Sequence, residues 1–241
     1  MHLDDYDYLV FFDTETTGLN ARENFIIELA CVRVSAHGIY KTDRFIKLPA
    51  GVELDEKITD LTGITELTLS AEGVREEEAA REFGELISGG KTLLIAHNAN
   101  FDLSFTGNML IRYKGLYPDY LKAFCEADYL DTLTVYKDRR PYPHKLKNAI
   151  EEYGLSDKVQ NSHRAIDDTL ALYEVFKAMR AERDDLADYI NIFGYNPKYG
   201  ISGEELKKVT YAAQPFRDYM TAPEYILPAR VKKEEDNNGN T

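Results

Sequence analysis

Short apolar runs alternate along this chain with segments in which apolar residues recur at helical spacing. Residues 9–12 form an unbroken apolar run, which is typical of a strand buried on both faces of an α/β sheet. Further strands are predicted over residues 25–34, 39–48 and 92–96. The turn at residues 35–38 makes the first two of these a hairpin. Residues 129–135 fit either another strand or the start of a helix.

Helices are predicted where apolar residues recur every three or four positions. A short helical turn over residues 59–65 ends at Gly63, and Gly154 closes a helix over residues 146–153. Longer helices are expected over residues 76–88, 101–113 and 164–180. Because strands and helices alternate from about residue 6 to residue 182, we expect a mixed sheet with helices on both sides.

The character of the chain changes after residue 183. Six of the seventeen tyrosines lie between Tyr189 and Tyr225, together with several glycines and prolines. A short helix is expected over residues 204–209. The predicted division is a core domain over residues 1–183, a Tyr-rich extension over 184–231 and a disordered polar tail over 232–241.

Composition limits the possible classes of protein. The chain has 241 residues with 44% apolar content, enough for one sizeable core and an appendage. No stretch is long enough to cross a membrane, the acidic N-terminus lacks the basic region of a secretory signal, and Cys31 and Cys125 form no CxxC pattern. These features predict a reduced, cytoplasmic protein without membrane contact.

The net charge of −13 argues against a broad duplex-binding surface, which is normally basic. An acidic protein can still act on nucleic acid if it handles only a few nucleotides in a metal-filled cleft. The charge therefore leaves phosphodiester chemistry open.

The first apolar strand ends in two carboxylates, Asp13 and Glu15. Strand side chains alternate between faces, so these two point the same way, roughly 7 Å apart along the backbone. Neighbouring anions repel each other unless a cation lies between them, and a divalent metal ion meets this need.

Two more acids follow apolar segments further along the chain. Asp102 falls in the first turn of the helix after residues 92–96, where capping is the commoner role of an acid. Asp131 has a similar position after residues 129–130. We interpret Asp131 as a residue that caps or holds the neighbouring loop, and leave it out of the site.

The start of the last long helix offers a histidine and two adjacent acids. Asp168 shares the inward face of this helix with Ala165 and Leu172, whereas Asp167 lies on the solvent side. A carboxylate on a buried stripe needs a partner, so Asp168 is the candidate metal ligand. His163 precedes the helix, where a loop can bring it towards a reacting water.

Together these segments resemble the three motifs of the DnaQ-like (DEDDh) exonucleases. The motifs are matched by residues 12–19, 96–102 and 163–168, and residues 61–65 are similar to a segment of bacterial proofreading exonucleases such as the epsilon subunit of DNA polymerase III. The resemblance covers about residues 6–180. It implies a ribonuclease H-like fold, a mixed five-stranded sheet flanked by helices, with its site at the carboxyl ends of strands.

The resemblance also implies roles for individual residues. Asp13, Glu15, Asp102 and Asp168 would hold two Mg²⁺ or Mn²⁺ ions, which oxygen ligands suit, and His163 would be the general base. Substrate contacts are implied for a second set, in which Leu19 and Phe101 have core packing as the alternative role: Thr16, Thr17, Leu19, His97 and Phe101.

The expected activity is 3′→5′ hydrolysis of single-stranded DNA to nucleoside 5′-monophosphates, either free-standing or as proofreading for a DNA polymerase. An exoribonuclease or short-oligonucleotide hydrolase stays open, and the acidic charge suits it. A nucleotide phosphohydrolase would instead free phosphate or pyrophosphate. A non-catalytic polymerase accessory module would dock through the Tyr-rich extension, but the complete set of acids and histidine argues against it.

Overall fold

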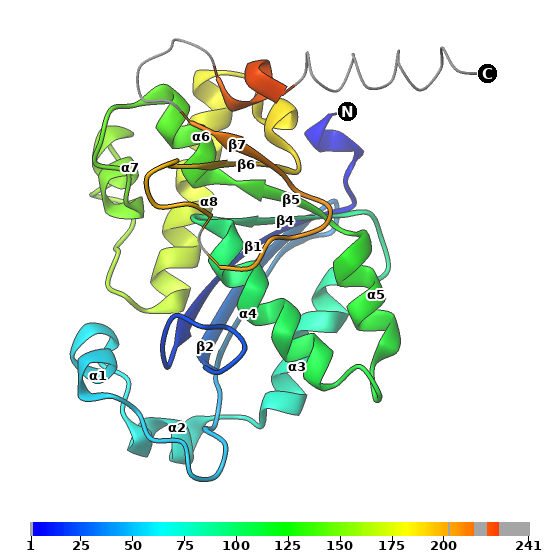
Figure 1. Ribbon diagram of the computed structural model, residues 1–241, viewed down its shortest axis with the longest axis vertical. Coiled ribbons are helices and arrows are strands. Elements are labelled where there is room, and N and C mark those ends of the chain that lie inside the picture. Colours follow the sequence, from blue (N-terminus) through cyan, green and yellow to red (C-terminus); the bar gives the residue numbers. More distant parts are fainter. Residues whose placement is uncertain (1, 202, 215–220, 227–241) are drawn as a thin grey trace.

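The computed structural model describes residues 2–201, 203–214 and 221–226, and a five-stranded sheet lies at its centre (Figure 1). The strands are β1 (Tyr8–Thr16), β2 (Ile26–Ser35), β3 (Gly38–Phe45), β4 (Thr92–Ala96) and β5 (Asp128–Asp131). They lie in the order β3-β2-β1-β4-β5. Strands β1, β4 and β5 are parallel, whereas β2 is antiparallel to both β1 and β3. The predicted mixed five-stranded sheet is confirmed.

Helices cover both faces of the sheet (Figure 1). One core lies under α3 (Glu76–Ile87), α4 (Ala99–Arg112) and α5 (Pro118–Glu126), and the other under α6 (Thr132–Arg139), α7 (Leu146–Glu152) and α8 (Ala165–Glu182). The chain also forms η1 (Leu3–Asp5), α1 (Glu56–Thr62) and α2 (Glu66–Glu72). Among the described residues, no helix combines the length and apolar character that crossing a lipid bilayer requires.

The side chains of β1 are divided between these two cores. Phe12 belongs to the core under α3 and α4, whereas Phe11 packs edge-on against two aromatic rings of α8, with centroids 5.0 Å apart in each pair. Because strand side chains alternate, Asp13 and Glu15 lie on the same side as Phe11, and Thr14 faces α4. Asp13 and Glu15 therefore face α8.

Several local predictions are confirmed. Gly63 ends α1 in a left-handed conformation with φ of 72°, which glycine adopts readily. Strands β2 and β3 form the predicted hairpin. The ambiguous segment at residues 129–135 contains both elements, because β5 ends at Asp131 and α6 begins at Thr132. Helices α2 and α5 were not predicted.

The extension, which follows α8 in the sequence, packs against β5 at one edge of the sheet. It contains η2 (Leu186–Tyr189) and a parallel pair of strands, β6 (Ile192–Tyr195) and β7 (Thr210–Ala213). Asn191 fastens this pair to β5, because its backbone N–H donates to the Tyr129 carbonyl at 2.8 Å and its side-chain oxygen accepts from the Tyr129 N–H at 2.9 Å.

The predicted helix over residues 204–209 is wrong: these described residues form a loop with a turn at Lys207 and Lys208. The Lys208 ammonium donates to the carbonyls of Glu126 and Ala127 at 2.6 and 2.8 Å, and these bonds draw the chain toward the end of α5. The predicted tail, residues 232–241, lies outside the described residues. The division into core domain and extension stays a prediction.

Candidate active site

The four predicted carboxylates meet at the carboxyl end of β1. Asp13 and Glu15 come from that strand, Asp102 from the first turn of α4, and Asp168 from the first turn of α8. Asp13 lies close enough to the other three for their charges to act on it. Elements separated by most of the domain therefore bring all four acids to one place.

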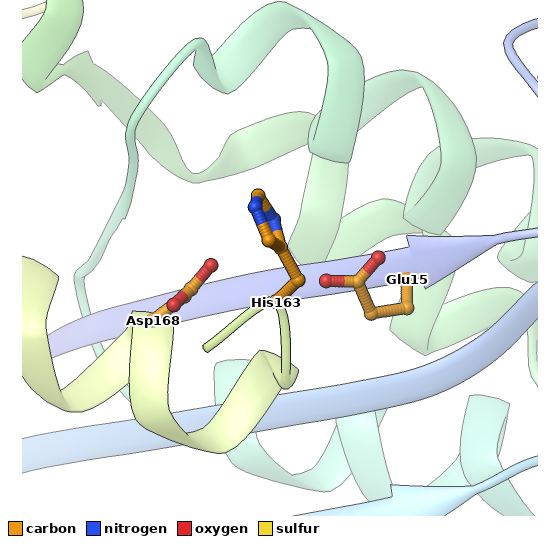
Figure 2. Close-up of side chains that lie close together, drawn as sticks. All are labelled: Glu15, His163 and Asp168. Atoms are coloured by element: carbon orange, nitrogen blue, oxygen red, sulfur yellow. The ribbon is translucent and has the colours of Figure 1, made fainter. Parts of the chain in front are cut away.

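Figure 2 shows Glu15, His163 and Asp168 side by side, and one potential ligand atom of each lies within 4.8 Å of those of the others. His163 comes from the loop before α8 and is exposed. Its φ of 57° is left-handed, which is uncommon for a residue other than glycine. Two carboxylates and an imidazole at this spacing can coordinate a divalent cation or act together on a water bound between them.

Asp102 is locked between β1 and α4. Its carboxylate accepts hydrogen bonds from the backbone N–H and the hydroxyl of Thr14, at 3.0 and 2.7 Å, and the residue is 3% exposed. Since Thr14 lies between Asp13 and Glu15 in the strand, the same bonds also fix the positions of these two acids relative to α4.

The two adjacent acids of α8 have different surroundings. Asp168 is 7% exposed and accepts a hydrogen bond from the Asn161 side-chain nitrogen at 2.7 Å. Asp167 is half-buried and accepts one from the Ser162 hydroxyl at 2.5 Å. Only Asp168 points to the cluster, as the helical spacing predicts.

The cluster carries more negative charge than its protein surroundings compensate. Burial raises the pKa of Glu15 to about 8 and the pKa values of Asp102 and Asp168 to about 7 each. Burial, followed by repulsion from the other acids, raises the pKa of Asp13 well above its ordinary range. The positive charge of Arg164 lowers the pKa of Glu15, but its guanidinium is hydrogen-bonded to Glu28. A site of oxygen donors with uncompensated charge fits a divalent cation.

The residues predicted to contact the substrate differ in their exposure and in their present hydrogen bonds. Leu19 is 85% exposed, so the alternative that it is a core residue is wrong. Phe101 is half-buried and packs on the ring of Phe105, with centroids 4.8 Å apart. The Thr16 hydroxyl donates to the Gly18 carbonyl, and the Thr17 hydroxyl accepts from the Phe25 N–H. Substrate contacts at these residues stay predictions.

His97 and Asp131 hold the neighbouring loops. The ring nitrogens of His97 are bonded to the Thr132 hydroxyl at 3.0 Å and to the His144 carbonyl at 2.9 Å. A substrate contact through either nitrogen, which stays a prediction, would compete with these bonds. Asp131 accepts from the backbone N–H groups that begin α4 and α6, at residues 98, 99, 133 and 134. The predicted capping role of Asp131 is confirmed.

Sequence reasoning missed Glu28. This residue lies opposite Glu15 in the pairing of β2 with β1, and its side chain is 0% exposed. It accepts hydrogen bonds from Arg164 and from the Ala165 N–H. An acid within the apolar run of residues 26–32 is the signal that would have pointed to it.

Comparisons with known proteins agree with this geometry. The family model described as exonuclease matches residues 10–176. The DNA polymerase III subunit epsilon of Treponema pallidum is 32% identical over 170 residues, covering 70% of this chain and 75% of that protein. The PolC-type DNA polymerase III of Clostridium perfringens is 29% identical over 203 residues, and the match covers 84% of this chain but 13% of the polymerase.

Among solved structures, E. coli exonuclease I in complex with a dT13 oligonucleotide has the same fold. The superposition has a TM-score of 0.66 at 21% identity and covers 76% of this chain and 43% of that one. The family model thus confirms the exonuclease family, the Treponema pallidum relative confirms the resemblance to DNA polymerase III epsilon, and the superposition confirms the fold. The chain belongs to the exonuclease family.

Proposed function

We propose that this protein is a metal-dependent 3′→5′ exonuclease that hydrolyses single-stranded DNA and releases nucleoside 5′-monophosphates. The observation that carries the proposal is the cluster of Asp13, Glu15, Asp102 and Asp168 with His163 beside it. Membership of the exonuclease family supports the reaction class. The oligonucleotide bound to exonuclease I, a protein of the same fold, supports the choice of substrate.

The four acids would hold the metal. Carboxylate oxygens are the ligands that Mg²⁺ and Mn²⁺ prefer. Burial raises the pKa values of these groups, and a bound cation would stabilise their ionised forms. Two such ions, when bound, lower the pKa of an attacking water and stabilise negative charge on the leaving 3′ oxygen.

His163 would accept the proton of the attacking water at a ring nitrogen. Its ring is exposed to solvent, yet lies beside Glu15 and Asp168 (Figure 2). Histidine is the side chain most often used for proton transfer of this kind. Thr14 keeps Asp102 in place by two hydrogen bonds, and Asn161 does the same for Asp168 by one.

The terminal nucleotide would lie over the loop after β1. Leu19 offers an exposed apolar side chain there, and Phe101 presents part of its ring. Packing of bases on such side chains does not read their sequence, as a general exonuclease requires. Thr16 and Thr17 would lie near the terminal sugar, and His97 would take part only if one of its present bonds is exchanged.

The test uses 5′-labelled single-stranded DNA, RNA of the same sequence and a dinucleotide, each with Mg²⁺, Mn²⁺ or a chelator. We expect a metal-dependent ladder that shortens from the 3′ end of the DNA, with nucleoside 5′-monophosphates as product. Preference for RNA or for the dinucleotide would favour the exoribonuclease or short-oligonucleotide alternative. No cleavage of any substrate with either metal would contradict the proposal.

We further propose that the substrate is presented by a DNA polymerase, because relatives of this chain are named as DNA polymerase III epsilon and PolC. A primer with a mismatched 3′ end tests this role. The protein should remove the mismatched nucleotide faster than a matched one when it is added to a polymerase that lacks its own exonuclease. Equal rates on both primers would contradict a proofreading role.

A further inference from the structure

An ion pair between the fully buried carboxylate of Glu28 and the half-buried guanidinium of Arg164 lies one strand away from the acidic cluster. Glu28 of β2 accepts hydrogen bonds from Arg164 at 3.0 and 3.2 Å through Nε and at 2.7 Å through Nη2. Its second oxygen also accepts from the Ala165 N–H at 2.9 Å. A carboxylate with a 0% exposed side chain is costly unless it is paired and hydrogen-bonded, and these four bonds meet that need.

The pair joins the start of α8 to the sheet. Arg164 is the N-cap residue of α8, and its guanidinium lies over the ring of Phe45 on β3, with 4.8 Å from Cζ to the ring centroid. The same guanidinium reaches Glu28 on β2. A planar guanidinium that contacts a carboxylate through two nitrogens and stacks on a ring is fixed in orientation as well as in distance.

His163 is the residue immediately before this anchor. Its backbone has the left-handed φ of 57°, so the conformation depends on the residues that hold it on either side. On the N-terminal side, Asn161 bonds to Asp168 at 2.7 Å. On the C-terminal side, the anchor is Arg164 on Glu28.

We propose that Glu28 and Arg164 are positioning residues: their pair holds the backbone of residue 163 so that the imidazole stays beside Glu15 and Asp168. The inference rests on the proposed exonuclease function and extends it to two residues with no direct part in metal or substrate binding. A displacement of about 1 Å in a catalytic group lowers the rate by on the order of 10²-fold. Loss of the pair should therefore affect turnover far more than KM.

The experiment measures kcat and KM on labelled single-stranded DNA for Arg164→Lys and Glu28→Gln, alone and combined with His163→Ala. Lysine keeps the charge of arginine but loses the two-nitrogen contact. Each single variant should lower kcat by about 10–100-fold and change KM by less than about threefold. Combined with His163→Ala, each should add less than about threefold, because the group it positions is gone. If the loss of kcat in a double variant equals the product of the losses in its two single variants, the proposal is overturned.

The matched control is Arg180→Lys, which alters another ion-paired arginine of α8. Arg180 bonds to Asp4 at 2.9 Å on the surface, away from the cluster. The kcat of the Arg180→Lys variant should equal that of the unmodified protein. Mn²⁺ affinity, measured by calorimetry, should stay within about threefold in Arg164→Lys, and a larger loss would overturn the proposal by showing that the pair acts through the metal ligands.

A spectroscopic readout separates this inference from the proposed function. The imidazole NMR signal of His163, assigned by its loss in His163→Ala, should shift or broaden in Arg164→Lys and stay unchanged in Arg180→Lys. An unchanged signal in Arg164→Lys would overturn the positioning role, whether or not the protein is active. Absence of cleavage by the unmodified protein would contradict the proposed function alone.

Discussion

Replacement of Glu15 by glutamine should stabilise the metal-free protein at alkaline pH, although it removes a proposed metal ligand. Burial, together with repulsion from Asp168, Glu28 and Asp102, raises the pKa of Glu15 from 4.5 to about 8. Between these two pH values the folded protein keeps a proton on Glu15 that the unfolded chain has released. The free energy of unfolding therefore falls as the pH rises through this window, and the whole penalty is present above pH 8.

The size of this penalty follows from the shift. A change in pKa from 4.5 to about 8 corresponds to about 5 kcal/mol at 1.36 kcal/mol per unit. Glu15 is partly exposed, so solvent screening reduces the recoverable free energy to roughly 2 kcal/mol. Glutamine has nearly the same size without the charge and should recover this amount. In a domain of this length, it corresponds to an increase in Tm of roughly 4–8 °C.

Thermal unfolding in chelator at pH 5 and pH 8.5 measures the effect. The unmodified protein should lose stability between these values, and Glu15→Gln should lose less and have the higher Tm at pH 8.5. The matched control is Glu72→Gln, at the exposed end of α2, which should follow the unmodified protein. Added Mn²⁺ should raise the Tm of the unmodified protein more than that of Glu15→Gln. A Tm for Glu15→Gln at or below that of the unmodified protein in chelator at pH 8.5 would refute this reasoning.

Four further substitutions or pairs test other parts of the site. Asp13→Ala should abolish nucleotide release and Asp167→Ala should retain most of it; equal losses would mean that the wrong acid of α8 was chosen. His163→Ala should lower kcat by about 10²–10⁴-fold while Mn²⁺ affinity in calorimetry is kept. Asp131→Ala should lower the free energy of unfolding in urea by about 1–3 kcal/mol, because four backbone N–H groups lose their acceptor. Leu19→Ala should raise KM for DNA with kcat unchanged, and a fall in kcat alone would place Leu19 outside the substrate site.

Strands β1, β2 and β4 were predictable because each is a short apolar run, and β3 because it follows β2 across a short turn. The four residues of β5 were too few to be told from the start of a helix. Helices α2 and α5 were missed for a similar reason. Helix α2 has seven residues and buries only Leu69, and α5 has nine and buries only Phe124, so neither repeats an apolar pattern often enough to be recognised. In the extension, hydrogen bonds from Lys208 to the end of α5 outweigh the helical preference of residues 204–209.

Within the site, local sequence could not separate Asp102 from Asp131. Both follow strands and precede or begin helices, and their roles differ through the groups that surround them. Asp131 accepts from four backbone N–H groups, which use its oxygens for capping. Asp102 accepts two hydrogen bonds from Thr14, both at the same carboxylate oxygen, and its charge acts on Asp13 and Glu15. Glu28 depends on a partner 136 residues away, a relation that only the folded chain reveals.

The acidic net charge and the proposed substrate are compatible because of where the charge is concentrated. A phosphodiester that approaches Asp13, Glu15, Asp102 and Asp168 without metal meets a group of acids. Burial raises the pKa of each of them, and repulsion from the other acids of the cluster raises the pKa values of Asp13 and Glu15 further. Divalent ions held by these four acids would offset their negative charge, although the protein as a whole has a net charge of −13. The ions would then supply positive charge at the point where hydrolysis takes place, and we expect them to be bound before the strand arrives. An acidic surface further out would repel long duplex DNA, and a single-stranded end that reaches the metal site is the form of substrate that such a charge distribution admits.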